Sequence, residues 1–552
     1  MLTDRSGLTA FERLLTVFTR VRPGEGRTVL LFMLHAFLLL FSYQVVKALR
    51  EAFMLAKFTA EVRSYAVAIT ALILMLLVPV YGAVRRRIDG ARLLQAITVF
   101  FAANMLVFAA AAWSGMSIAF PYFVWASIFG LMVVSQLWAF AADSFNLKSG
   151  QRIFPVIMVG ANVGALAGAK TAQLAAAALT PVGLLVLATL LLLATLFLAA
   201  PERAAVPEGS RAIAAEHGRP VPKLLGGLGL VMRDRYLRLI ALLVVLLNWI
   251  NTTGEFILAD FVQRDAAARV AASGGALTAS VLIAEFYGSF QFWVTVVGLA
   301  IQLFLVARIY RTVGVKGALL IHPVVVAIGY GLLALSPMLG GFVPIFTLIR
   351  LVKIAENATD YSLMNTTRQA LFLPVDRDAK YEGKTAIDTF FWRFGDLLQA
   401  GVVYVGLNVL GWTAPTFALL NLVLALAWIG LAVSIGREFS RKALENVTNV
   451  APEASRPIGD VAYEPGRPLR HVVVEDAFVD ADPGDVLYLS ARLEDGRPLP
   501  AWLRFDPKSR AFAGDAPEGY SEELRITVIA NDVDGLEATS TFVMRCSLQQ
   551  SR

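Results

Sequence analysis

The sequence is poor in cysteine and in charge. Its 552 residues include a single cysteine, Cys546, so no disulfide can form within the chain. Only 16% of the residues are charged, whereas soluble domains carry about 25%. The chain has no P-loop, no HExxH motif and no Cys/His pattern of metal-ligand spacing. We therefore expect a protein that is not an enzyme and that holds no metal or other cofactor.

Apolar residues fill most of the chain instead. They make up 57% of the sequence, against about 45–50% in soluble domains, and the mean hydropathy is +0.64. Runs long enough to cross the hydrocarbon core, which takes about 20 residues, recur from Val29 to Ile435. The pattern predicts a multi-pass membrane protein with twelve spans at 28–49, 64–84, 93–113, 121–144, 154–177, 182–200, 237–258, 286–308, 317–336, 344–366, 386–410 and 415–436.

The order of these spans suggests a domain organisation. Six spans, a long basic loop and six more spans are the layout of a major facilitator transporter, which holds its substrate near the membrane midplane between two halves. Alternating runs such as "ELRITVIAND", separated by turn signals, predict a small β-sandwich at the end of the chain. The predicted regions are an amphipathic segment on the membrane surface (1–27), a six-helix bundle (28–200), a cytoplasmic central loop (201–236), a second six-helix bundle (237–436), a polar linker (437–467) and the sandwich (468–552).

Lysine and arginine indicate the orientation of the spans. The segments "VRRRIDGAR", "RIYRTVGVK" and "GREFSRK" follow spans two, eight and twelve, whereas "SGMSIAFP" and "PMLGGF" on the opposite side carry no lysine or arginine. Because basic loops stay in the cytoplasm, we expect both termini to be cytoplasmic. The net charge of +7 is then a topology signal, so we expect a lipid bilayer and no nucleic acid as partner.

Ionisable side chains inside spans are rare and usually face a cavity or one another. Span one ends with Lys47 and Arg50, which share a helical face. They would either receive an anion or extend toward the lipid interface. In span seven, Asn251 and Glu255 are four residues apart and also share a face. We predict that all four belong to a substrate-binding site.

Span ten places opposite charges together. Lys353, Glu356 and Asp360 follow one another at intervals of three and four residues, so they share a helical face. An internal salt bridge would neutralise them, but apolar residues would be less costly there. A cavity that binds a charged solute explains them better, and we predict Lys353 and Glu356 as substrate-binding and Asp360 as gating or coupling.

Spans four and eleven supply further candidates. Arg393 could hold an anion through two parallel hydrogen bonds and is predicted to bind substrate. Asp388 and Asp396 lie in the same span and are predicted to serve gating or coupling. Asp143, near the end of span four, is either a gating residue or a solvated helix end.

Span five carries glycines at a regular interval. Gly160, Gly164 and Gly168 are four residues apart in "GANVGALAGAK". Such spacing lets a second helix approach closely. We read this pattern as structural and expect close helix packing here.

Several segments resemble the nucleotide transporter family of plastids and obligate intracellular bacteria, the ATP/ADP antiporters. They are spread over about residues 10–436: "VRPGE", "SYQVVKALREAFML", "LWAFAADSFNLKSGQRIFPVIMVGANVG", "NWINTTGEFIL" and "YSLMNTTRQALFLPVDRDAKYEGKTAIDTFFWRFGDLLQAG". The last segment, which joins spans ten and eleven, is the most specific. The resemblance implies a major facilitator fold and exchange of ATP for ADP or related nucleotides.

The same resemblance implies roles for individual residues. Lys47 and Arg50 occupy the family's basic pair in span one, and Asp143 and Glu255 its acidic positions in spans four and seven. Arg368 falls at the basic position of the family's stretch after span ten, and we predict it as a gating or coupling residue.

The chain also departs from the family in that stretch. Asp360 stands where the family has lysine, and Asn365, Thr366 and Gln369 replace its aspartate, proline and glutamate. Replacing a cation by an anion changes how phosphate would bind. The substrate therefore stays open between nucleotides and related phosphorylated anions.

The C-terminal region resembles an immunoglobulin-like module of the cadherin or dystroglycan type. The matching segment is "FVDADPGDVLYLSARLEDGRPLPAWLRFDPKSRAFAGDAPEG". The acidic stretches "DADPGD" and "NDVDG" fit turns better than a calcium site. Such modules usually bind partners outside cells, so either the module works inside with an unknown protein partner or the span count is off by one.

Three functional hypotheses follow. The first is a secondary transporter of a bacterial inner (plasma) membrane that exchanges nucleotides or related phosphorylated anions by alternating access. The second is a proton-coupled transporter of another small metabolite, with Asp143, Glu255 or Asp360 as its proton site. The third is a transporter-derived sensor or scaffold that acts through its β-domain.

Overall fold

A computed structural model of the whole chain describes residues 26–85, 90–144, 147–205, 224–338, 344–376, 379–447, 450–481, 486–532 and 535–547. The predicted amphipathic segment 1–27 lies outside these residues except for its last two. The chain divides into two compact units, Met1–Ser440 and Arg441–Arg552.

The first unit is built from helices. These are α2 (Gly26–Leu55), α3 (Ala60–Arg85), α4 (Gly90–Trp113), α5 (Ala119–Ser144), α6 (Leu147–Ala205), α8 (Leu224–Arg233), α9 (Arg235–Ala272), α10 (Ala279–Ala300), α11 (Ala307–Ala334), α12 (Ile345–Thr359), α13 (Asn365–Ala370), α14 (Lys384–Ala386), α15 (Trp392–Asn408) and α16 (Ala414–Val447). Short π-helical segments are η1 (Ile301–Val306), η3 (Asp360–Met364), η4 (Ala379–Gly383) and η5 (Ile387–Phe391), and η2 (Ser336–Met338) is a 3₁₀ turn. All twelve predicted spans fall on these elements, to within two residues at their ends.

Two of the long helical stretches contain two spans each. In the described part of the chain, seven continuous stretches are long and apolar enough to cross a membrane. One of them is interrupted at Thr180, with φ 59°, and another at Gly314, with φ 64°. These residues lie where the sequence predicts the boundaries between spans five and six and between spans eight and nine. Each stretch is therefore a pair of spans joined by a short turn.

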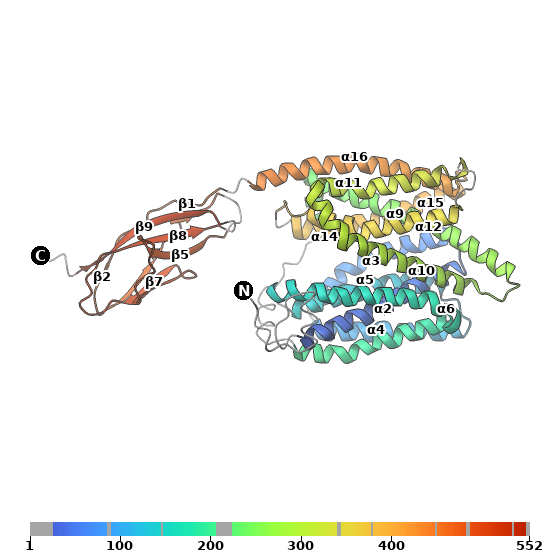
Figure 1. Cartoon of the computed structure of the whole chain (residues 1–552), viewed down its shortest axis with the longest axis horizontal. Coiled ribbons are helices and arrows are strands. Elements are labelled where there is room, and N and C mark those ends of the chain that lie inside the picture. Colours follow the sequence, from blue (N-terminus) through green and yellow to red (C-terminus); the bar gives the residue numbers. More distant parts are fainter. Residues whose placement is uncertain are drawn as a thin grey trace. The chain divides into compact units, whose positions relative to one another are not determined.

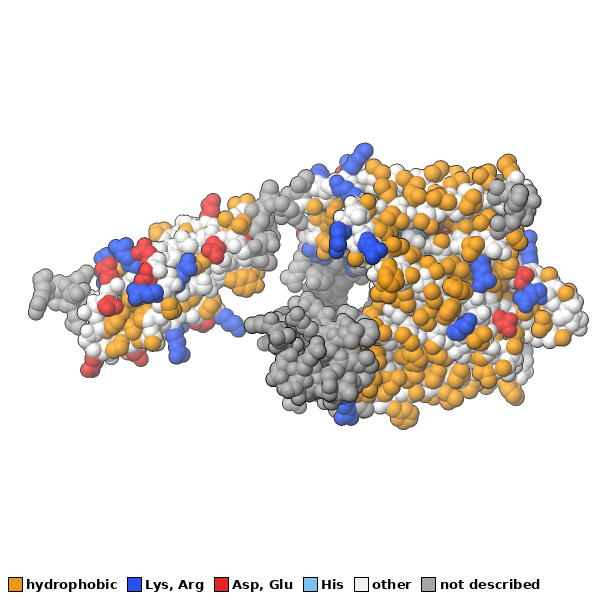
Figure 2. All heavy atoms as spheres, viewed as in Figure 1, with side chains coloured by type: hydrophobic (Ala, Val, Ile, Leu, Met, Phe, Trp, Pro, Cys, Tyr) orange, Lys and Arg blue, Asp and Glu red, His pale blue; other side chains and the backbone are white. Residues whose placement is uncertain are grey.

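The helices of the membrane unit form two halves. Figure 1 shows α2 to α6, in blue to teal, as one group, and α9 to α16, in green to orange, as the other. The halves meet where α3 packs against α15 and α9, and where α10 packs against α6 and α2. Apolar side chains cover most of the face seen in Figure 2, and Leu76, Phe197 and Leu303 are largely exposed. Such an exterior suits lipid, so the unit is a multi-pass membrane bundle.

Helices α2 and α6 make the closest contact within the first half. A Cβ on Gly160, Gly164 or Gly168 would lie within 2.3 Å of a backbone carbonyl oxygen of α2. No side chain fits at these positions, so the prediction of close helix packing from the glycine spacing is confirmed.

The second unit is an all-β module. Its strands are β1 (Glu453–Ala454), β2 (Val461–Tyr463), β3 (Pro468–Val472), β4 (Phe478–Val479), β5 (Tyr488–Leu493), β6 (Leu503–Asp506), β7 (Ala511–Asp515), β8 (Leu524–Asn531) and β9 (Glu537–Cys546). They form a four-stranded sheet in the order β2-β9-β8-β5, a three-stranded sheet β3-β7-β6 and the pair β1-β4. The prediction of a small all-β module at the end of the chain is therefore confirmed.

The predicted polar linker 437–467 holds more structure than expected. Helix α16 continues to Val447, because "REFSRKALENV" is rich in good helix formers. Strands β1 and β2 also lie in this range. Strand β2 is too short to be recognised by alternation and exists through its parallel pairing with β9, which lies far away in the sequence.

Candidate functional site

A cavity lies between the two halves of the membrane unit. It encloses about 340 Å³, within the roughly 300–1,000 Å³ typical of small-molecule sites. Side chains of α2, α3, α5, α9, α10, α12, η3 and α15 line it. Its charged lining residues are Lys47, Arg50, Glu51, Arg63, Glu255, Arg393 and Asp396. With four cations against three carboxylates, the walls carry a net positive charge.

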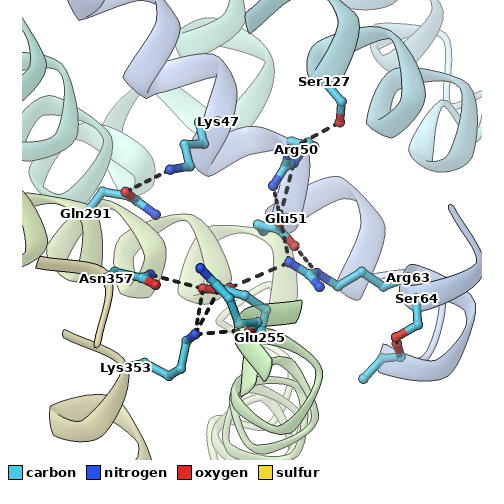
Figure 3. A network of polar contacts seen from close by, with 12 residues as sticks. Lys47, Arg50, Glu51, Arg63, Ser64, Ser127, Glu255, Gln291, Lys353 and Asn357 are labelled. Atoms are coloured by element: carbon cyan, nitrogen blue, oxygen red, sulfur yellow. Dashed lines mark hydrogen bonds and ion pairs between the residues drawn. The ribbon is translucent and has the colours of Figure 1, made fainter. Parts of the chain in front are cut away.

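Glu51 is the centre of an ion-pair cluster in this cavity (Figure 3). Arg50 Nη2 lies 2.6 Å from Glu51 Oε1, and Arg63 Nε lies 2.5 Å from Glu51 Oε2. Arg50 also donates to the Ser127 hydroxyl at 3.2 Å. Glu51 and Arg63 are only 2% and 4% exposed. The two guanidinium groups compensate the cost of burying this carboxylate.

Glu255 extends the cluster to the other half of the bundle. It lies on α9, and its Oε2 is 3.7 Å from Arg63 Nη2. Its Oε1 is 3.7 Å from Lys353 Nζ and accepts a hydrogen bond from Asn357 Nδ2 at 3.1 Å. Glu255 thus joins cations from both halves of the molecule.

Lys353 and Glu356 lie behind the cavity wall. They are 0% and 2% exposed, and neither lines the cavity. Lys353 Nζ lies 3.0 Å from Glu356 Oε2 and donates to Asn251 Oδ1 at 3.1 Å, while the Tyr330 hydroxyl donates to Glu356 at 2.7 Å. A Cβ at Gly254 would overlap the Tyr330 hydroxyl. The glycine therefore makes room for this buried network, which reaches the cavity through Asn251 and Glu255.

Lys47 differs from the other cations of the cavity. Its Nζ donates to Gln291 Oε1 at 3.1 Å and lies 5.7 Å from the centre of the Tyr361 ring. Within the described residues no carboxylate lies within ion-pairing distance of this ammonium group. Lys47 is therefore the lining cation best able to accept an anionic ligand without giving up a carboxylate.

Another part of the lining comes from α9 and α15. Asn248 Nδ2 donates to Asp396 Oδ1 and to the Trp392 carbonyl, both at 2.7 Å. Arg393 Nη1 lies 3.4 Å from Asp396 Oδ2, and the Arg393 side chain is 23% exposed. Arg393 can thus still reach a ligand, while Asp396 holds α9 and α15 together.

Three predicted gating residues, Asp360, Arg368 and Asp388, lie away from the cavity lining, and a fourth cannot be placed relative to it. Asp143 belongs to α5, but its side chain lies outside the described part of the structure. Arg368 stacks on the Trp392 ring, 4.6 Å from its centre. Asp360 is 5% exposed, and one carboxylate oxygen of Asp388 is buried with no hydrogen-bond partner in the described part of the chain. Asp360 and Asp388 both lie in π-helical segments, which occur frequently at functional sites.

Sequence reasoning missed Arg63 as a member of the site. The predicted span begins at residue 64, which left Arg63 in the preceding loop, but α3 begins at Ala60. Glu51 likewise lies beyond the predicted end of span one at residue 49, although α2 continues to Leu55. The sequence did offer one signal for this ion pair, because Glu51 and Arg63 carry opposite charges and lie at the adjoining ends of spans one and two.

Comparisons with known proteins find a match in each unit. Residues 169–439 match the family model described as "TLC ATP/ADP transporter", and residues 449–547 match the model described as "Putative Ig domain". An ADP,ATP carrier protein 1 of Chlamydia pneumoniae is 23% identical over 380 residues, which cover 61% of this chain and 70% of that protein. A plastidic ATP/ADP-transporter of Solanum tuberosum is 26% identical over 356 residues, 58% of this chain and 53% of that protein.

Solved structures are similar in fold. The nucleoside transporter NupG aligns with a TM-score of 0.51 at 15% identity over 75% of this chain and 99% of its own. A bacterial homologue of the iron transporter ferroportin, in its inward-facing state, aligns with a TM-score of 0.51 at 14% identity over 75% of this chain and 98% of its own. The membrane unit therefore has the twelve-helix major facilitator fold predicted from the sequence.

Proposed function

We propose, from the premise that the membrane unit of this chain belongs to the TLC ATP/ADP transporter family, that it exchanges ATP, ADP or related phosphorylated anions across a membrane. The relatives named above are described as carriers of ADP and ATP. A fold with two halves and a cavity between them supports alternating access, in which the halves rock about the bound substrate.

The observation that carries this proposal is the environment of Lys47. It is a cavity-lining cation with a glutamine and an aromatic ring as neighbours and, among the described residues, no carboxylate in ion-pairing reach. A phosphate group would take charge-assisted hydrogen bonds from Lys47 and Arg50, which lie one helical turn apart on α2. Arg393 would hold a second group of the substrate, and the Trp392 ring would stack on the base.

The carboxylates of the site explain why transport would be an exchange. Glu51 and Glu255 pair with Arg50, Arg63 and Lys353. A bound phosphate would take over some of the cations in these ion pairs. The carrier with substrate and the carrier without it would therefore have different ion pairs between the halves. The empty carrier keeps its pairs and stays closed, and Glu356 and Asn251 hold Lys353 in place from behind the wall.

The remaining predicted residues are proposed to serve gating or coupling. Asp360, Arg368 and Asp388 flank or occupy the π-helical turns of the segment that joins the two site helices α12 and α15. Asp396 ties α9 to α15, and Asp143 ends the span four helix. π-helical turns are frequent at functional sites, and a change in the winding of these turns would move the site residues with it.

The location of the protein is part of the proposal. We place it in the inner (plasma) membrane of a bacterium with both termini in the cytoplasm, because lysine and arginine are more abundant in the loops on one side of the predicted spans. The β module would then meet a protein partner on the cytoplasmic side.

The test is counter-exchange in proteoliposomes. We expect labelled ATP to enter vesicles preloaded with ADP and not empty vesicles. Replacing Lys47 by glutamine should lower nucleotide affinity by about tenfold or more, because it removes a charge-assisted hydrogen bond. The control is Lys57→Gln, an exposed lysine beyond the end of α2, which should leave exchange unchanged.

Two results would contradict the proposal. One is uptake into empty vesicles driven by a pH gradient, which would favour the proton-coupled alternative. The other is the absence of any nucleotide that raises the melting temperature of the purified protein, since a ligand at 100 times its Kd should stabilise the folded state by about 2.7 kcal/mol.

A further inference from the structure

Arg63 joins the two halves of the molecule at one end of the cavity. It lies on α3, lines the cavity and is 4% exposed. Its guanidinium contacts Glu51 in its own half at 2.5 Å and Glu255 in the other half at 3.7 Å (Figure 3). One cation thus holds two carboxylates that would otherwise repel each other across the interface.

Neighbouring contacts close the same end of the bundle. Ser64, the next residue on α3, accepts a hydrogen bond from Gln399 Nε2 of α15 at 3.2 Å, and both side chains are buried. Gln263, near the far end of α9, donates to the backbone carbonyls of Leu55 and Phe58 at 3.0 and 2.8 Å. Arg63 is the charged member of this closure that also reaches the cavity.

The bridge is unequal on its two sides. Arg63 contacts Glu51 through both Nε and Nη2, at 2.5 and 3.2 Å, in the two-pronged geometry that arginine prefers. Its contact with Glu255 is a single one at 3.7 Å, and Glu255 keeps Lys353 and Asn357 when that contact breaks. An anion that attracts Arg63 would therefore break the contact between the halves first.

We infer that Arg63 is the residue through which an anion in the cavity releases the closed end of the carrier. The anion draws the guanidinium of Arg63 away from Glu255. Glu51 and Glu255 each still have a cation, and the halves can then separate at the contact between Ser64 and Gln399. This inference rests on the proposed function for the identity of the anion. Its effect on the closed end is independent of that identity.

Replacing Arg63 is compatible with folding. In Arg63→Gln, Glu51 retains Arg50 at 2.6 Å and Glu255 retains Lys353 and Asn357, so neither buried carboxylate loses its last partner. Arg63→Lys keeps the charge and loses the two-pronged contact. The matched control is Glu61→Gln on the same helix. Glu61 accepts an exposed hydrogen bond from Asn408 of α15 at 2.6 Å, and neither residue lines the cavity.

The experiment uses a thiol as a reporter of the closed end. The native cysteine is removed by Cys546→Ser, and Ser64→Cys places a thiol at a side chain that is 1% exposed and does not line the cavity. The full-length purified protein is treated in detergent with a bulky water-soluble maleimide, with and without ADP. With Arg63 present we expect slow labelling that ADP accelerates.

In the Arg63→Gln background we expect labelling without ligand to be about tenfold faster or more, the scale of one close charge pair at an interface. ADP should then have no further effect, and Arg63→Lys should fall between the two. Glu61→Gln keeps a side-chain oxygen that can accept the hydrogen bond from Asn408, so it should change the rate by less than about twofold.

The inference is overturned if Arg63→Gln labels at the rate of the unsubstituted background, or if ADP still accelerates its labelling. If ADP and other nucleotides affect no variant, the proposed function fails. A faster basal rate in Arg63→Gln would in that case still assign the closure to Arg63.

Discussion

At the scale of single residues, the site depends on charges that share partners. Lys353 is fully buried and contacts two carboxylates, Glu356 at 3.0 Å and Glu255 at 3.7 Å. Glu356 has the Tyr330 hydroxyl as its other partner. Removing one member of such a pair leaves a buried charge uncompensated, whereas removing both charges does not.

This sharing predicts a specific pattern of stability. Lys353→Met alone should destabilise the protein by about 3–5 kcal/mol, because Glu356 then keeps no cation. Lys353→Met combined with Glu356→Gln should regain most of the lost stability, while exchange stays impaired because Glu255 has lost a partner. The melting temperatures of the two variants in detergent provide the measurement. Equal melting temperatures for the single and the double variant would show that the pair is not coupled.

The sequence predicted some members of this network and not their arrangement. Lys353 and Glu356 could be paired from their spacing of three residues on one helix. Their position behind the cavity wall depends on Tyr330 and Gly254, which come from other helices. The bridge of Arg63 to Glu255 likewise joins helices of different halves, and no local pattern encodes such a contact.

At the scale of elements, backbone contact between α2 and α6 positions the first half of the site. Lys47, Arg50 and Glu51 all lie on α2, so the place of this helix sets their positions. The three glycines of α6 bring the two backbones together. This feature could be predicted from sequence, because a repeat of four residues on a helix is a local pattern with one geometric meaning.

A glycine pair in the membrane unit tests this packing. A Cβ on Gly164 would lie 2.2 Å from the Phe37 carbonyl oxygen, whereas nothing lies within 4 Å of a Cβ on Gly401 of α15. Gly164→Ala should therefore destabilise the protein by about 1–3 kcal/mol, as overpacking does. Gly401→Ala should be neutral or stabilise it by up to about 1 kcal/mol, because alanine favours helix. The prediction fails if both variants melt at the same temperature.

At the scale of the whole molecule, an even number of spans determines where the β module lies. Twelve spans would place both termini on one side of the membrane, and the distribution of lysine and arginine predicts that this side is the cytoplasm. Modules of this type commonly serve outside cells. A β module found in the cytoplasm would therefore be one adapted to work inside, whereas a β module found outside would show that the predicted number of spans is wrong. Cys546 cannot report on this, because it is buried in the module at 3% exposure.

An introduced thiol decides the location. In a Cys546→Ser background, Tyr488→Cys replaces a side chain on β5 that is 63% exposed. A maleimide that does not cross membranes should fail to label it in intact spheroplasts and should label it once the membrane is permeabilised. Ala276→Cys, exposed in the turn between α9 and α10, should be labelled without permeabilisation, because that turn lies at the opposite end of span seven. Labelling of Tyr488→Cys in intact spheroplasts would mean either that the number of spans is odd or that the whole bundle is inverted in the membrane. Only in the inverted bundle would the contacts around Arg63 face the cytoplasm.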